Sequence, residues 1–100
     1  MQHNVYRYKF SPSLDITEVE ATVNLAILAT ESLHGESRVC LEARYEFDAI
    51  ARTCAINATG EVGRDLNRLF LGFISREFGR SNFEIESVPD LEGASAASVA

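Results

Sequence analysis

The segment from Arg38 to Phe47 alternates without interruption between two kinds of side chain. Because successive side chains of a strand point to opposite faces, this period of two predicts a half-buried β-strand with one solvated face. The chain is therefore expected to fold around a sheet. The inward set is Val39, Leu41, Ala43, Tyr45 and Phe47, and the outward set is Arg38, Cys40, Glu42, Arg44 and Glu46.

Three further segments have strand character. They are Val5 to Phe10, Arg52 to Ala58, and Phe83 to about Val88. A short loop around Asp48 to Ala51 is expected to join the second and third strands as a hairpin. In the first strand the aromatic side chains share one face, so we expect them to point into the core; they are Tyr6, Tyr8 and Phe10.

Two segments have helical periodicity. The first is expected from Ile16 to Leu33, after an N-cap at Asp15, and it ends at His34-Gly35. The second is expected after Thr59-Gly60, with Thr59 as the N-cap, and it ends at Gly79. Both helices therefore stop at a glycine, which can adopt a left-handed conformation there.

The expected order is strand, helix, strand, strand, helix, strand. This order predicts an α+β fold, a ferredoxin-like βαββαβ two-layer sandwich with a four-stranded antiparallel sheet and two helices on one face. The fourth strand would lie beside the first, with Glu84 and Glu86 opposite Arg7 and Lys9. We expect a single domain over residues 1–89 and a disordered tail over 90–100, where small polar residues show no periodicity.

The charge balance disfavours some partners. Fifteen acidic and nine basic residues give a formal net charge of −6, which repels nucleic acids and anionic membranes. The longest nearly apolar run, residues 21–29, is too short to cross a bilayer. The first ten residues lack the pattern of a secretory signal, and two cysteines are too few for a disulfide framework. We therefore expect a cytoplasmic protein.

The sequence predicts no catalytic residue, cofactor or metal site. His34 has no second histidine, cysteine or paired carboxylate at metal-ligand spacing, and a helix-capping role suits it better than catalysis. Cys40 has Arg38 and Arg44 nearby, which favours a reactive thiol that binds a ligand, but Glu42 offsets that field. An inert thiol is the simpler interpretation.

Arginine side chains form a row on the second predicted helix. Arg64 and Arg68 are one turn apart, and Arg76 lies near the same arc. Such a row is a candidate site for an anion or an acidic partner. Two other interpretations are a solvated helix face and docking against the acidic residues of the first helix, within one chain or between two.

The first helix is apolar over more of its circumference than one sheet can cover. A second stripe beside the core-facing one consists of Ala21, Leu25, Leu28 and Ala29. It predicts either packing against the second helix of the same chain or an interface with another copy. The leading functional hypothesis is a non-catalytic interaction or oligomerisation module whose partner is itself, as a homodimer, or another protein. A small-ligand or anion-binding regulatory domain is the alternative, and an enzyme is third.

Overall fold

The computed structural model describes residues 4–88, which form an α+β fold. The predicted disordered tail, residues 90–100, lies outside the described residues. Short connections join the elements. In chain order these are β1 (Val5–Phe10), α1 (Ile16–His34), α2 (Glu36–Glu42), β2 (Arg44–Asp48), β3 (Thr53–Asn57), α3 (Glu61–Phe78), a 3-10 turn (Arg80–Asn82) and β4 (Phe83–Val88).

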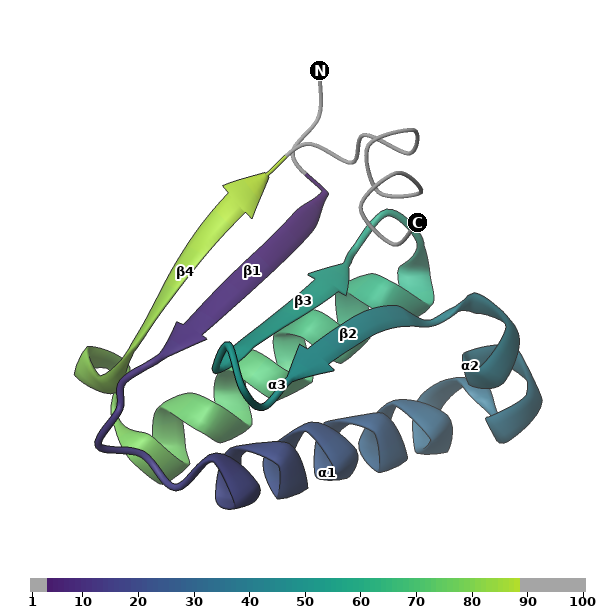
Figure 1. The fold of residues 1–100 in the computed structure, drawn as a ribbon. Coiled ribbons are helices and arrows are strands. Elements are labelled where there is room, and N and C mark those ends of the chain that lie inside the picture. Colours follow the sequence, from purple (N-terminus) through teal and green to yellow (C-terminus); the bar gives the residue numbers. More distant parts are fainter. Residues whose placement is uncertain (1–3, 89–100) are drawn as a thin grey trace.

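The four strands form one antiparallel sheet in the order β2-β3-β1-β4. Figure 1 shows α1 and α3 lying side by side against one face of this sheet. The register places Arg7 opposite Glu86 and Lys9 opposite Glu84. The predicted pairing of the first and fourth strands is therefore confirmed, with opposite charges facing each other on the open face.

The long strand expected from Arg38 to Phe47 is wrong over its first half. Residues Glu36–Glu42 form the helix α2, and β2 begins only at Arg44. Val39 is buried whereas Leu41 is 79% exposed, a difference that a helix produces and a strand with both side chains inward does not. Gly35 ends α1 at φ 91°, and its carbonyl accepts the first hydrogen bond of α2 from the Val39 N–H.

The second long helix also begins differently from the expectation. Its N-cap is Gly60 rather than Thr59, and no side chain caps it. Asp15 does cap α1 as predicted, because its carboxylate accepts a hydrogen bond from the Thr17 N–H at 3.0 Å. Gly79 ends α3 as predicted.

The core lies between the sheet and the two long helices, and aromatic side chains dominate it. Tyr8 and Phe10 of β1 are buried, as predicted, and Tyr8 contacts Phe70 of α3 edge to face at 4.9 Å. The Tyr8 hydroxyl donates a hydrogen bond to the side-chain oxygen of Asn67 at 2.6 Å. Burial raises the pKa of Tyr8, so this hydroxyl remains a donor across the physiological range.

The side chain of Arg52, in the turn between β2 and β3, binds the connection between β1 and α1. Arg52 adopts φ 59° and donates hydrogen bonds from its guanidinium to the carbonyls of Ser11 and Leu14. These bonds hold the turn against the β1–α1 connection. Two charged hydrogen bonds offset the modest cost of a left-handed backbone at a non-glycine residue.

Candidate functional site

The outward face of α1 exposes apolar side chains. Leu25 is 53% and Leu28 60% exposed, although both lie in the middle of a 19-residue helix. Ala21 is exposed as well, whereas the predicted fourth member, Ala29, is half-buried. We define the outer stripe as Ala21, Leu25, Leu28 and Ser32, four positions that share one helix face at spacings of three and four.

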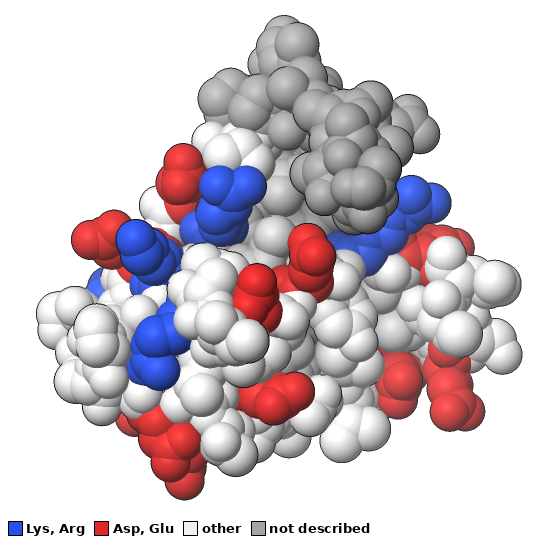
Figure 2. Space-filling model, viewed as in Figure 1, with Lys and Arg blue, Asp and Glu red and all other residues white. Residues whose placement is uncertain are grey.

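The opposite face of α1 accounts for the core contacts. Val19, Val23 and Ala26 join the core, and α1 packs alongside α3. The helix α3 does not cover the two leucines of the outer stripe, so packing among residues 4–88 does not account for them. Figure 2 shows mainly uncharged atoms along the lower part of the molecule, where α1 lies, with a few acidic side chains among them.

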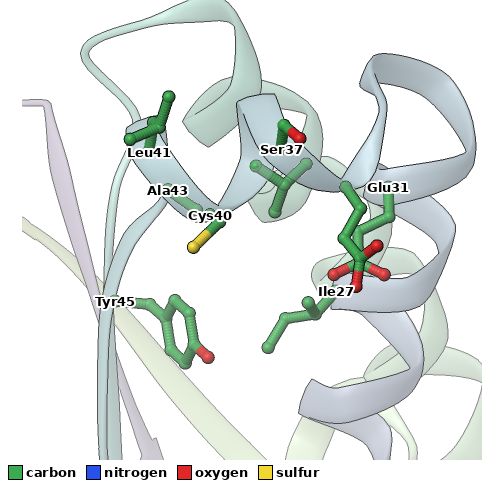
Figure 3. Close-up of a pocket in the computed structure, with 9 residues that line it drawn as sticks. Ile27, Glu31, Ser37, Cys40, Leu41, Ala43 and Tyr45 are labelled. Atoms are coloured by element: carbon green, nitrogen blue, oxygen red, sulfur yellow. The ribbon is translucent and has the colours of Figure 1, made fainter.

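An open cavity of about 710 Å³ lies between α1, α2 and the free edge of β2. In Figure 3 the side chains of Ile27 and Tyr45 face each other across it, and the Cys40 sulfur points into the space. Glu31 and Leu41 also line it. Its walls combine apolar surface with carboxylates, and the described residues that line it include no histidine, lysine or arginine to activate the thiol or the hydroxyls.

The two cysteines have different environments. Cys40 lies exposed on α2, not on a strand between two arginines as expected. Its presumed activator Arg38 instead forms ion pairs with Glu42 and Glu61, each at 3.1 Å. Cys54 is fully buried, and burial raises the pKa of its thiol to about 12, which keeps it protonated and unreactive.

His34 links α1 to α3, whereas its position at the end of a helix predicted only a capping role. Its Nε2 lies 2.8 Å from the Asp65 carboxylate of α3, and its Nδ1 lies 3.4 Å from an Arg38 nitrogen. The His34 side chain is 8% exposed. Nothing in the sequence pairs residues 31 positions apart, so Asp65 could not be identified in advance. In residues 4–88 no group of three or more His, Cys, Asp or Glu side chains is placed to hold a metal ion.

The arginine row of α3 divides into two parts. Arg64 and Arg68 line one cavity of about 280 Å³ together with Tyr6 and Asn67, whereas Arg76 lies elsewhere on the helix. The ion pair that joins α1 and α3 is formed by His34 and Asp65, not by these arginines. The sequence thus identified two cationic residues that the structure does bring together.

Comparison with protein-family models, with curated proteins and with solved structures finds no match to this chain. None of the helices in residues 4–88 combines the length and apolarity needed to cross a membrane. The fold and the surface of the chain itself therefore carry the functional argument.

Proposed function

We propose that this chain is a non-catalytic self-association module that forms a homodimer through the outer stripe of α1. One observation carries the proposal: Leu25 and Leu28 are each more than half exposed at the centre of the longest helix. Contiguous apolar surface on a small domain typically marks an interaction site. The two free thiols are compatible with a reducing, cytoplasmic location.

We further infer that the fold is a variant of the ferredoxin-like arrangement. The strand order β2-β3-β1-β4, with all pairs antiparallel and both long helices on one face, supports this inference. The addition is α2, a short helix inserted between α1 and β2. In such a sandwich the outward faces of the helices remain available for a partner.

The outer stripe is suited to a second copy because it is self-complementary. Two α1 helices packed antiparallel about the midpoint of the stripe would place Leu25 of one copy opposite Leu28 of the other. Ala21 would then lie opposite Ser32, small residues that permit close approach of the helices. No charged side chain belongs to the stripe. Glu31 lies on the flank of the stripe, and in this arrangement it would be level with Thr22 of the other copy and not with another carboxylate.

The expected affinity is modest. Full burial of an exposed leucine side chain contributes about 1.5–3 kcal/mol. Leu25 and Leu28 are 53% and 60% exposed, so each of the four leucines in a two-fold interface would contribute about half of that. Loss of translational and rotational freedom costs at least about 4 kcal/mol. The balance favours a dimer that dissociates on dilution.

Introducing a charge into the stripe should disrupt this dimer. Leu25→Glu and Leu28→Glu should each raise the dissociation constant by about 100-fold or more, because a buried leucine contact is lost and a carboxylate would be desolvated without a partner. The monomers should remain folded, since both positions are exposed. The measurement is molar mass by light scattering over a dilution series.

Ile50→Glu is the matched control. Ile50 is 96% exposed, lies in the turn between β2 and β3, and undergoes the same change of charge. The dissociation constant of the Ile50→Glu dimer should match that of the unmodified protein. If the unmodified protein has the mass of a monomer, 11.0 kDa, at every concentration, the proposal is wrong. It is also wrong if Ile50→Glu weakens the dimer as much as the leucine variants do.

A further inference from the structure

A polar cavity lies where β1 begins and α3 starts, away from the outer stripe of α1. It measures about 280 Å³, and its lining includes Arg64, Arg68, Asn67, Tyr6 and Thr59. Among the described residues no acidic side chain lines it. The described part of this lining therefore carries two positive charges, whereas the chain as a whole has a net charge of −6.

The two arginines retain donors for a ligand. Arg64 uses one guanidinium nitrogen to donate to the carbonyl of Thr59 at 3.2 Å, which fixes the side chain beside the cavity. Arg68 is 78% exposed and lies 3.9 Å from Asp65. The other carboxylate oxygen of Asp65 lies 2.8 Å from His34. Each guanidinium has five N–H donors, so most of them remain available.

Three other basic side chains of the chain face carboxylates. Arg38 is paired with Glu42 and Glu61. Arg7 and Lys9 lie opposite Glu86 and Glu84 across the β1–β4 ladder. The cavity at the start of α3 brings two further cationic side chains together on a protein of net negative charge.

A third donor is oriented by the core. The Asn67 side-chain oxygen accepts the hydrogen bond from the buried Tyr8 hydroxyl at 2.6 Å. Because the amide nitrogen lies on the other side of the same planar group, this bond directs the N–H donors away from Tyr8. Asn67 also lines the cavity, together with both arginines.

We propose that this cavity binds the phosphate group of a small phosphorylated metabolite, a phosphate monoester. Guanidinium groups recognise phosphate oxygens through paired, charge-assisted hydrogen bonds, and the Asn67 amide adds a neutral donor. The volume is sufficient for a phosphate and a body the size of a sugar, against which Tyr6 supplies an aromatic wall. A nucleic acid fits less well because its other phosphates would meet the net negative charge of the protein.

The experiment is a calorimetric titration of the full chain with glucose 6-phosphate, with glucose and sodium sulfate as separate controls at equal ionic strength. We expect saturable binding of the phosphate ester and none of glucose. Arg64→Gln and Arg68→Gln should each weaken binding at least tenfold. Arg76→Gln removes the same charge from the same helix outside the cavity and should leave the affinity unchanged.

Several outcomes would overturn the inference. The first is the absence of saturable binding of glucose 6-phosphate. Equal weakening by Arg76→Gln would indicate general charge attraction, and equal binding of sulfate would indicate an adventitious ion only. Tighter binding of a single-stranded oligonucleotide than of the monoester would assign a different partner class. The dilution curve of the dimer should be unaffected by Arg64→Gln, so failure here is distinguishable from failure of the self-association proposal.

Discussion

Replacing Gly63 with alanine should lower the free energy of unfolding by about 3 kcal/mol or more, a large part of the stability of a domain this small. Gly63 lies in the first turn of α3, where that helix crosses the end of β3. A Cβ built there would lie 2.0 Å from the backbone oxygen of Asn57 and 3.2 Å from the Ala58 Cα. Backbone atoms cannot give way as a flexible side chain can, so the helix itself must shift.

Gly72→Ala provides the matched control on the same helix. Nothing lies within 4 Å of a Cβ added there, and the position is exposed. Alanine has the higher helix propensity, so this variant should be more stable by about 0.5–1 kcal/mol. Urea denaturation of both variants measures the sign and the size of the change in the free energy of unfolding. Similar stabilities for the two variants would contradict the close approach of α3 to β3.

Phe70→Ala should remove about 3–5 kcal/mol of stability, a large part of the roughly 5–15 kcal/mol typical of a domain of this size. Phe70 is fully buried at the centre of the sandwich. Its ring contacts Tyr8 at 4.9 Å and Phe10 at 6.3 Å between centroids, so truncation leaves a cavity beneath the sheet. The measurement is the midpoint of urea unfolding with an unchanged slope.

Phe70→Leu separates lost volume from lost aromatic contacts. Leucine fills most of the space, so this variant should retain most of the stability that alanine loses. Phe78→Ala serves as a peripheral comparison, since Phe78 is only partly buried at the end of α3. A loss at Phe70→Ala no larger than that at Phe78→Ala would show that the core is not centred on Phe70.

The sheet and the two long helices could be predicted because their signals are local. Asp15 and Gly35 delimit α1, and the charges of Arg7 and Glu86 match the pairing of β1 with β4. The helix α2 could not be predicted from the alternation of side chains. A segment of only seven residues can fit the strand period of two and the helix period of 3.6 about equally well. The spacing of Arg38 and Glu42, four residues apart, was the available signal for a helix, and their side chains do form an ion pair at 3.1 Å.

The candidate surfaces were predictable to different degrees. The second apolar face that carries Leu25 and Leu28 can be counted from one helix alone, but only the structure shows that α3 leaves both leucines exposed. Placing Arg64 beside Tyr6 and Asn67 requires the packing of α3 against the end of β1. The His34–Asp65 contact likewise depends on the angle between two helices, which a sequence pattern does not encode.

The most direct test of self-association through α1 is an intermolecular distance between spin labels. A label at Asn24→Cys, on the exposed flank of α1, can be introduced with Cys40→Ser, since the remaining thiol, Cys54, is buried. Two antiparallel α1 helices with axes about 8–10 Å apart predict one distance of about 10–25 Å between labels, which disappears with Leu28→Glu. Absence of any intermolecular coupling in concentrated protein, or a distance that Leu28→Glu leaves unchanged, would contradict an interface formed by this helix.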